Sequence, residues 1–326
     1  MKNCSLIIAV YNKEPLLDAF FDCILSQGMN NKEAIFIDDC STDGTLKKLL
    51  SFAKINQDDA DDFGVYLLWK KNNILILHLK QNSGPSIARR LGIENATGKF
   101  FACVDPDDLI DPGMYDVLYN FAVVNNSDMV WENYYSGRIN DFHNLVYQRY
   151  PEDAIDMINV ILSGKTSSGA WNKLFRRSFA VKHNINFEPE RLLVCEDMVF
   201  MVNFLRYLPK INYYDGAHYH HIFYENSLSH RRQNREVMQS LHRIGEILSL
   251  LNLPECCQDG VRCVLERVKI GLMLSPECSS SLAYSAYPAV NAISLENAGG
   301  GEGEVIPVLC LQNEDASGRH NHDKII

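Results

Sequence analysis

Short apolar runs alternate with helix-like segments through the N-terminal part of the chain. The run Ser5–Val10 is unbroken and ends at the polar residues Tyr11 and Asn12, as expected for a strand that is buried on both faces of a sheet. Pro15 suits the first turn of a helix, and the apolar residues after it recur at helical spacing. Because this order of strand and helix then repeats, the sequence predicts an α/β fold with right-handed crossovers onto a mostly parallel sheet.

The same patterns assign the other segments of the chain. Strands are predicted at residues 33–39, 73–79, 99–104, 128–135 and 211–229, and helices at 16–24, 45–53, 85–95, 111–121, 193–205 and 235–274. The acidic and aromatic insertion at 55–72 is predicted to form an extra loop or hairpin. Residues 170–179 are predicted to form a turn with a short helix.

The composition is that of a globular, acidic protein. Hydrophobic residues make up 46% and charged residues 22% of the 326 residues, which excludes an overall disordered or fibrous chain. The net charge of −10 lacks the basic footprint of a nucleic-acid-binding protein. No apolar run approaches the roughly 20 residues of a membrane span, and cysteines such as Cys4, Cys103 and Cys195 lie scattered at apolar positions. We therefore expect a cytoplasmic protein with buried free thiols and no nucleic-acid partner.

Polar side chains gather where the predicted strands end. Tyr11 and Asn12 follow the first strand, Asp39 ends the second, and the acids of residues 105–108 follow the fourth. Ligands of open parallel sheets bind beyond the carboxyl ends of the strands, so these side chains should share one edge. An acid at that edge can accept hydrogen bonds from ribose hydroxyls or a base, and Tyr11 offers a ring for stacking, although it could equally pack on the sheet.

The acids Asp105, Asp107 and Asp108 are the most specific chemical signal of this edge. Two carboxylates held at about 4 Å repel by roughly 1 to 4 kcal/mol, depending on the effective dielectric constant. A fold that gathers them must expose them, raise their pKa values or bind a cation. Oxygen ligands of this kind suit Mg²⁺ or Mn²⁺ bound together with phosphate oxygens. The alternative is that the acids only cap the following helix.

Four motifs occur in a fixed order along the chain: AVYNKE at 9–14, IDDCSTDGT at 37–45, NSGPSIARRLGIENATGKF at 82–100 and VDPDD at 104–108. Together they resemble the nucleotide-sugar half of a glycosyltransferase family 2 enzyme with the GT-A fold. The segments AWNKLFRRSF and HYHHIFYENSLS and the Glu196–Asp197 pair resemble the acceptor half of bacterial capsule and lipopolysaccharide members. Neither GxGxxG after the first strand nor a P-loop motif is present, which disfavours those two nucleotide-binding classes.

The resemblance implies roles for residues of the donor half. Tyr11, Glu14 and Asp39 would hold the nucleobase and ribose of the nucleotide-sugar donor. Asp105 and Asp107 match the DxD motif, in which the second acid contacts the Mn²⁺ or Mg²⁺ ion that bridges the donor diphosphate.

The resemblance also implies an acceptor site and a reaction. Asp197 would be the catalytic base of a single inverting displacement, Glu196 would lie beside it near the acceptor, and Arg89 matches a recurring Ala-Arg near the donor pocket. The departures are Arg90, where the family usually has Asn, and the 55–72 insertion. They affect details of the donor pocket rather than the class of enzyme.

Several other side chains are candidates for roles in the acceptor half. His220 is a candidate additional metal ligand, although a cluster of His218, His220 and His221 is also typical of a surface or of acceptor hydrogen bonding. Trp171 and Lys173 could line the acceptor site, and core packing explains Trp171 equally well. The basic run at 231–235 is either a solvated helix face or a contact with anionic lipid headgroups at the inner face of a membrane.

The chain is thus expected to divide into a GT-A catalytic domain at 1–230, a helical extension at 231–275 and a flexible tail at 276–326. Within the first, residues 1–110 would bind the nucleotide-sugar, with UDP favoured by analogy, and 111–230 a glycan or lipid-linked acceptor. A sugar nucleotidyltransferase is the main alternative, but AVYNKE is not its Gly-rich loop. A non-catalytic nucleotide-sugar or glycan-binding module could lose the acids, and here all of them are present.

Overall fold

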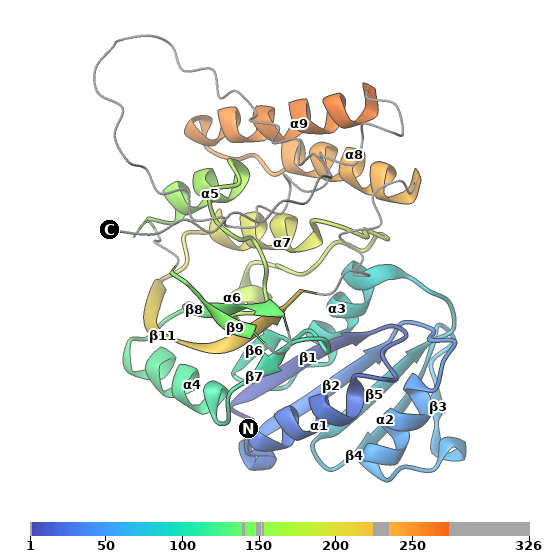
Figure 1. The fold of residues 1–326 in the computed structure, drawn as a ribbon. Helices are drawn as coiled ribbons and strands as arrows, with labels where there is room; N and C mark the ends of the chain where they lie inside the picture. Colours follow the sequence, from blue (N-terminus) through green and yellow to red (C-terminus); the bar gives the residue numbers. More distant parts are fainter. Residues whose placement is uncertain (1, 139–140, 148–150, 152, 224–234, 274–326) are drawn as a thin grey trace, which may run out of the picture. The chain divides into compact units, whose positions relative to one another are not determined.

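One mixed sheet forms the centre of the protein, in the strand order β3-β4-β5-β2-β1-β6-β10-β8-β11-β7, with β9 paired to β8 (Figure 1). The computed structural model describes residues 2–138, 141–147, 151, 153–223 and 235–273. Its central strands β5, β2, β1 and β6 are parallel, and antiparallel pairs flank them on both sides. The predicted α/β fold with a mostly parallel central sheet is therefore confirmed.

The strands have the following bounds: β1 Cys4–Val10, β2 Lys32–Asp38, β3 Asp61–Asp62, β4 Tyr66–Lys71, β5 Ile74–Leu79, β6 Phe100–Cys103, β7 Leu109–Ile110, β8 Met129–Arg138, β9 Asp141–Val146, β10 Lys173–Arg176 and β11 Ile211–Ile222. The helices are α1 Leu17–Ser26, α2 Thr45–Ala53, α3 Gly84–Asn95, α4 Met114–Val124, α5 Ala154–Leu162, α6 Arg177–Lys182, α7 Glu196–Leu205, α8 Arg235–Leu250 and α9 Gln258–Met273.

Strand β1 is apolar from Leu6 to Val10 because helices cover both faces of the sheet. Successive side chains of a strand point to opposite faces, and accordingly Ile7 packs in one core while Leu6 and Ile8 pack in the other. Buried residues of α3, α5, α7 and α8 belong to the first core. Those of α1, α2 and α4 belong to the second. Every predicted strand of this sheet is thereby fixed between two apolar layers.

Most of the predicted elements are present. The 55–72 insertion forms a hairpin, β3–β4, on the outer edge of β5. The expected turn at 170–176 is wrong in part, because Lys173–Arg176 form β10 between β6 and β8 before the short helix α6 begins. A strand of four residues gives no clear period in the sequence, and its pairing on both sides decides its conformation.

The predicted helical segment 235–274 consists of two helices. Helix α8 ends at Leu250, and a short 3-10 turn that follows Pro254 leads into α9. Ile244, Leu248 and Val261 join the first core together with α5 residues, so α8 and α9 pack onto the catalytic sheet's helical layer. Residues Met1–Asn291 form one unit, and the second unit, Ala292–Ile326, lies outside the described residues, as do the tail at 276–326 and the basic run at 231–234.

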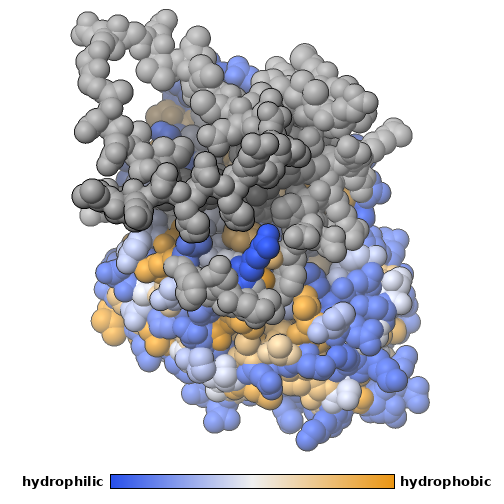
Figure 2. Space-filling view, viewed as in Figure 1, coloured by the Kyte–Doolittle hydropathy of each residue, from blue (hydrophilic) through white to orange (hydrophobic). Residues whose placement is uncertain are grey.

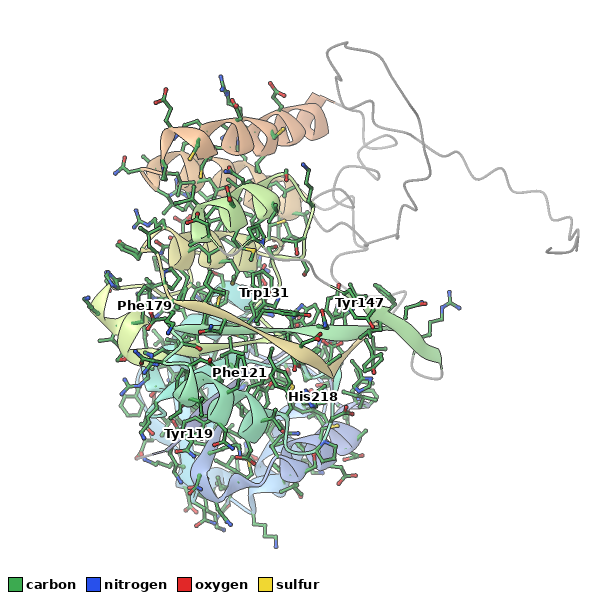
Figure 3. The ribbon with its side chains drawn as sticks, turned by 90° about the vertical axis from the view of Figure 1, so that its left-hand side faces the viewer. Tyr119, Phe121, Trp131, Tyr147, Phe179 and His218 are labelled. Carbon is green, nitrogen blue, oxygen red and sulfur yellow. The ribbon has the colours of Figure 1, made fainter. Side chains whose placement is uncertain are left out.

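Figure 3 shows how the two faces of the sheet differ. Trp131 of β8 points to the face that carries α7, whereas Phe121 of α4 and His218 of β11 lie on the opposite face. Trp131 belongs to the first core, and Phe121 packs against the second. Successive side chains on a strand point to opposite faces of the sheet. The face on which each residue lies therefore decides which side chains of β8, β10 and β11 can contact those of α7.

Hydrophilic residues cover most of the described part of the face seen in Figure 2, interspersed with smaller apolar patches. No helix in the described ranges is long and apolar enough to cross a membrane. Cys4, Cys103 and Cys195 are buried free thiols, as predicted, whereas Cys256 and Cys263 are exposed.

Helix α3 lies so close to the sheet that it requires a glycine at position 92. A Cβ atom there would lie 2.3 Å from Cγ2 of Ile7 and 2.8 Å from Cδ1 of Ile37. We expect Gly92→Ala to lower the free energy of unfolding by about 1 kcal/mol or more, because overpacking of 1–3 kcal/mol exceeds the helix-propensity gain of about 1 kcal/mol. Urea unfolding measures this change. The exposed helical substitution Ser51→Ala serves as a control and should leave stability unchanged or slightly raised; an equally neutral Gly92→Ala would contradict the close approach.

Candidate active site

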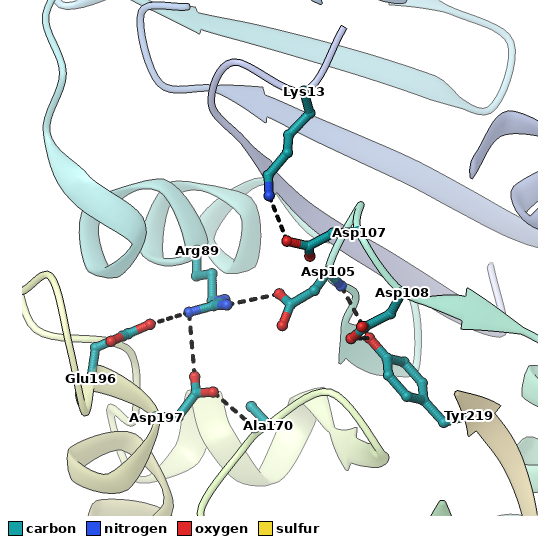
Figure 4. Close-up of polar contacts among 9 residues, drawn as sticks. All are labelled: Lys13, Arg89, Asp105, Asp107, Asp108, Ala170, Glu196, Asp197 and Tyr219. Atoms are coloured by element: carbon teal, nitrogen blue, oxygen red, sulfur yellow. Dashed lines mark hydrogen bonds and ion pairs between the residues drawn. The ribbon is translucent and has the colours of Figure 1, made fainter. Parts of the chain in front are cut away.

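The loop that follows β6 presents two of its acids to basic side chains. Asp107 pairs with Lys13, which extends from the loop after β1, and Asp105 accepts a hydrogen bond of 2.8 Å from Arg89 of α3 (Figure 4). Asp105 and Asp107 are each 23% exposed at the side chain, so both can be reached by a ligand. The two acids therefore line the predicted edge and do not act as caps for α4, which begins after Gly113.

The third acid of this loop is structural. Asp108 is buried, and its carboxylate accepts hydrogen bonds of 2.8 Å from the Tyr219 hydroxyl and from the backbone N–H of Ile222. Burial, followed by the nearby charges of Asp107 and Asp105, raises its pKa well above the ordinary value. Asp108 thus ties the acidic loop to β11 rather than binding a ligand.

Arg89 joins the acidic loop to the N-terminus of α7. Its guanidinium group hydrogen-bonds Asp105 and Glu196, and it lies 3.4 Å from Oδ1 of Asp197 (Figure 4). The side chain of Arg89 is 9% exposed and those of Glu196 and Asp197 are 7% and 4% exposed. The structure therefore brings together Asp105, Arg89 and the acid pair, which the sequence analysis assigned separately to donor and acceptor.

In this cluster, burial and the neighbouring opposite charges shift each pKa in opposite directions. Burial alone would lower the pKa of Arg89, but the charges of Asp197, Asp105 and Glu196 hold it well above its ordinary value. Burial raises the pKa of Glu196 to about 7, although Arg89 acts in the opposite direction. Burial also raises the pKa of Asp197, again against the charge of Arg89. Raised pKa values of this kind are typical of acid and base residues in active sites.

Two carboxylate oxygens of the acid pair are buried without a hydrogen-bond partner among the described residues: Oε2 of Glu196 and Oδ1 of Asp197. The other oxygen of Asp197, Oδ2, accepts the backbone N–H of Ala170 at 3.1 Å. Buried polar atoms are usually satisfied. Oδ1 of Asp197 has the Arg89 guanidinium as an ion-pair partner at 3.4 Å, and both oxygens can still accept a hydrogen bond from a ligand. Cys195, directly before the pair, has a φ of +57°, a strained conformation that turns both acids inward at the helix start.

The predicted nucleotide-binding acids hold the loops at the strand ends. Asp39 is buried, and its two oxygens accept the backbone N–H groups of Ser83 and Gly84 at the start of α3, at 2.6 and 2.8 Å. Glu14 accepts the N–H of Gly44 before α2 at 2.8 Å. Tyr11 is 40% exposed at the same edge. Only Tyr11 among the three thus offers a largely free surface, while Asp39 and Glu14 shape the loops around it.

Trp171 and Lys173 do not line an open acceptor site in this structure. Trp171 is 6% exposed and stacks on Tyr219, with ring centroids 4.8 Å apart, and against His221 at 5.0 Å. Lys173 is 0% exposed, which leaves it no surface for contact with a substrate. Core packing therefore accounts for both positions, and for Lys173 this differs from the expected substrate contact.

The three histidines of β11 divide between the two sides of the strand. His220 accepts or donates a hydrogen bond with Asp111 at 2.9 Å, and His218 does so with buried Glu132 at 2.9 Å. His221 instead lies beside the acidic loop, where burial lowers its pKa and the charges of Asp105 and Asp107 oppose that shift. The candidate metal ligand His220 is thus directed to Asp111, away from the DxD acids.

The sequence alone assigned no contacts to Lys13, Asp108, Tyr219 and His221. Lys13 lies within the AVYNKE motif, and Asp108 within VDPDD, so their motifs were found but not their contacts. The sequence named His221 together with His218 and His220 but could not tell which of them lies beside the acids. The β-bulges of β11 between Tyr214 and Tyr219 set the register of this strand on β8, and with it the direction of each histidine.

The site fits a divalent cation that is bound jointly with a substrate. Asp105 and Asp107 can supply oxygen ligands, and His221 is near enough for their charges to act on its pKa. In the described part of the chain, no group of three or more His, Cys, Asp or Glu side chains is placed to hold a metal ion by itself. Mg²⁺ and Mn²⁺ commonly bind through one or two carboxylates plus waters and substrate phosphates, so this incomplete set matches them and not a structural zinc site.

Residues 5–187 match the family model described as Glycosyl transferase family 2, which covers more than half of the chain. The chain belongs to glycosyltransferase family 2. Among curated relatives of this family 2 member, a putative glycosyltransferase, EpsH of Bacillus subtilis, is 28% identical over 71% of this chain and 64% of its own length. A cholesterol galactosyltransferase of Borreliella burgdorferi is 27% identical over 66% of this chain and 58% of its own. The chain thus spans less than two thirds of the length of these two relatives.

Solved structures share the GT-A fold with this family 2 member. S. aureus TarS 1–349 in complex with UDP-GlcNAc superposes with a TM-score of 0.63 at 22% identity, over 85% of this chain and 77% of that chain. A mannosyltransferase from Pyrobaculum calidifontis, in complex with GDP-Man and Mn²⁺, gives a TM-score of 0.52 at 16% identity, over 87% and 73% of the two chains. At these identities the likeness establishes the fold alone.

The guanidinium of Arg89 should be the main stabiliser of the buried acids in this family 2 enzyme. We expect Arg89→Met to lower the free energy of unfolding by about 3–5 kcal/mol at neutral pH, because it leaves buried carboxylates uncompensated. Without the cation, the folded-state pKa values of these acids rise further above their unfolded values. The folded state then binds more protons, so the loss of stability should shrink as the pH falls below about 7, the pKa already reached by Glu196. Denaturant unfolding at several pH values measures both effects.

The neighbouring Arg90 provides a matched control. It donates a hydrogen bond to the Phe187 carbonyl and pairs with Glu94 of its own helix, with its side chain 33% exposed. Arg90→Met should therefore cost about 1 kcal/mol or less, with no similar dependence on pH. Equal losses for the two variants at every pH would show that Arg89 does not compensate the acid cluster.

Proposed function

We propose that this glycosyltransferase moves a hexose or an N-acetylhexosamine from a nucleotide-sugar, with UDP as the nucleotide, to a glycan or lipid-linked acceptor in surface polysaccharide synthesis. One observation carries the proposal: a single buried guanidinium, that of Arg89, contacts both the DxD acid Asp105 and the acid pair Glu196–Asp197. Donor-side and acceptor-side acids are therefore close enough to act on one sugar.

In the proposed reaction the acceptor hydroxyl attacks the anomeric carbon from the side opposite the diphosphate. A bond forms between the acceptor oxygen and the anomeric carbon as the bond from that carbon to the phosphate oxygen breaks. The electron pair leaves with the nucleoside diphosphate, and the hydroxyl proton passes to Asp197, so the configuration inverts. Oδ1 of Asp197 supports this role: it is buried, lies 3.4 Å from the Arg89 guanidinium, and accepts no hydrogen bond from the described residues.

Asp107 and Asp105 would hold the Mn²⁺ or Mg²⁺ ion, with His221 as a further ligand beside them. When bound, the ion would neutralise negative charge on the departing diphosphate. In the structure the ammonium of Lys13 pairs with Asp107. A positive charge therefore already lies beside this acid, where the metal ion would bind. Tyr11, which is exposed at the same edge, would stack on the base of the donor.

The donor and acceptor classes rest on likeness rather than on this chain's own contacts. TarS binds UDP-GlcNAc in its structure, and a poly(ribitol-phosphate) β-glucosyltransferase of Bacillus spizizenii is 28% identical over 61% of this chain. A lipid-linked acceptor would place the enzyme at the cytoplasmic face of a membrane, in peripheral contact with it.

A panel of nucleotide sugars tests the function directly. The purified chain is incubated with each sugar and Mn²⁺, with and without candidate acceptors, and release of nucleoside diphosphate is followed. Diphosphate release that depends on the metal and increases with one acceptor supports the transferase. Exchange of pyrophosphate with a sugar phosphate would instead identify a nucleotidyltransferase, and binding of a nucleotide sugar without any turnover would identify a binding module.

The role of Asp197 yields a mutational prediction. Asp197→Asn removes the base with little change of shape, and we expect the rate of transfer to fall by about 10²-fold or more, as positioned bases contribute 10²–10⁴. Affinity for the donor, measured by calorimetry with Mn²⁺, should change little. Asp18→Asn, on the exposed side of α1, is the control with unchanged activity. Near-normal turnover of Asp197→Asn would remove this residue as the base.

The two histidines of β11 can be separated by metal affinity. His221→Ala should weaken binding of Mn²⁺ in the presence of UDP by about tenfold or more, because it removes a ligand beside Asp105 and Asp107. His220→Ala should leave that affinity unchanged, since His220 is directed to Asp111. The electron paramagnetic resonance signal of free Mn²⁺ reports the affinity without any need for turnover. The reverse ranking would restore His220 as the candidate ligand.

A further inference from the structure

Lys173 is completely buried at the start of β10. Its direct partner on the antiparallel strand β8 is Trp131, and residues paired in this way point to the same face of a sheet. Nζ of Lys173 consequently lies 3.7 Å from the centroid of the Trp131 ring. Figure 3 shows that Trp131 points toward α7, so the charged end of Lys173 is held on the side of the sheet where the acid pair begins that helix.

Three acceptors surround the three N–H groups of the Lys173 ammonium. They are the carbonyl oxygen of Gly169, Oδ1 of Asn172 at 2.6 Å and the face of the Trp131 ring. None of these partners is a carboxylate, and no ion pair of Lys173 occurs among the described residues. Burial lowers the pKa of Lys173, while the charge of Asp197 acts across space in the opposite direction. The Lys173 amine is thus held next to the active site without direct contact with its carboxylates.

A single peptide group connects Lys173 with Asp197. The carbonyl of Gly169 accepts the hydrogen bond from Lys173, and the N–H of Ala170, which belongs to the same peptide, donates to Oδ2 of Asp197 at 3.1 Å. The described chain contains no cis peptide, so this C=O and N–H point in opposite directions. A cation at the oxygen end polarises the peptide and makes its N–H a stronger donor.

The turn that holds this peptide is tightly fixed. A Cβ at Gly169 would lie 2.2 Å from Nε1 of Trp171, so the close approach requires glycine. The N–H of Gly169 donates to the Ser167 hydroxyl at 3.2 Å, and Nδ2 of Asn172 donates to the Glu132 carbonyl at 2.7 Å. Asn172 therefore bonds both strand β8 and the Lys173 ammonium. These contacts hold the Gly169–Ala170 peptide in one orientation.

We propose that Lys173 is a positioning residue for the catalytic base: through the Gly169–Ala170 peptide it fixes Oδ2 of Asp197 and so holds Oδ1, which lies 3.4 Å from Arg89, in place for the acceptor hydroxyl. The inference rests on the proposed function, because that function assigns the base to Asp197. It replaces the expected substrate contact of Lys173 with an action through one peptide group.

The charge of Lys173 has a second consequence for Asp197. The charged and titratable groups that face this carboxylate are Arg89 of α3, Lys173 of β10, Asp105 after β6, Glu196 of α7 and the thiols of Cys103 and Cys195. Lys173 and Arg89 are the cations of this set. Removing one of them should raise the pKa of Asp197. Because a catalytic base must be ionised, lowering the pH should then abolish activity at a higher pH than in the unaltered protein.

Lys173→Met, which keeps the shape of the stem without the ammonium, tests the proposal. We expect kcat to fall by about tenfold or more, since the base loses its orientation, and the acid limb of the kcat profile to move to higher pH. The KM for the donor and the Mn²⁺ affinity measured by electron paramagnetic resonance should change little, because neither contact involves Lys173. Unchanged kcat together with an unmoved acid limb would overturn the proposal.

Lys32 provides a matched control elsewhere in the fold. It is also buried, at 1% exposure, and its Nζ donates to the carbonyls of Gln27 and Gly28 and pairs with Asp116, remote from the acid pair. Lys32→Met should lower the thermal unfolding temperature but leave kcat per folded molecule and the acid limb as they are. If Lys32→Met shifts the acid limb as much as Lys173→Met, loss of a buried lysine is a general structural effect and the proposal fails.

Two further variants separate the inference from the function on which it rests. Normal turnover by Asp197→Asn would remove the base and the inference together. An inactive Asp197→Asn with an unaltered Lys173→Met would overturn only the role of Lys173. Lys173→Gln, which is neutral but polar, should show the same shift of the acid limb and replaces Lys173→Met if that variant does not fold. If neither variant folds while Lys32→Met does, Lys173 has a purely structural role and the proposal fails.

Discussion

One buried guanidinium holds the active site of this protein together. Arg89 contacts Asp105, 16 residues away in the sequence, and Glu196, 107 residues away. Several carboxylates in so small a buried volume would otherwise repel or take up protons. The planar fork of arginine can bond more than one carboxylate at once, which a lysine cannot do in the same geometry. Helix α3, which carries Arg89, therefore links the strand ends to α7, and the close approach at Gly92 keeps that helix on the sheet.

The loops at the strand ends serve the same purpose by a different interaction. Asp39 and Glu14 accept backbone N–H groups at the starts of α3 and α2, where a negative charge also favours the helix dipole. Left-handed backbone at Asn12, Cys40 and Cys195 turns the chain sharply beside these acids. Such strain is tolerated where the surroundings fix the conformation, and it is concentrated at functional sites. The edge of the sheet is thus rigid before any ligand binds.

Much of the fold and part of the site could be predicted from the sequence. The buried strands and amphipathic helices have clear periods, and the family motifs identified Asp105, Asp107 and Asp197 as candidates. Strand β10 was missed because its four residues are too few to show a period. Lys173 was expected to line the acceptor site, although lysines are seldom buried and its burial leaves no sign in the local sequence. Its burial depends on Trp131, which pairs with it across two strands.

The sequence by itself determined the alternation of strands and helices, the acids at the strand ends and the membership of family 2, because period and motif are local properties. The tertiary structure decided which acids meet at Arg89, that Asp108 serves β11, that His221 rather than His220 faces the DxD loop, and that Lys173 acts through a peptide. These outcomes depend on strand pairing, β-bulges and helix packing between residues far apart in the chain. No local pattern encodes such distances, since they follow from how the apolar faces fit together.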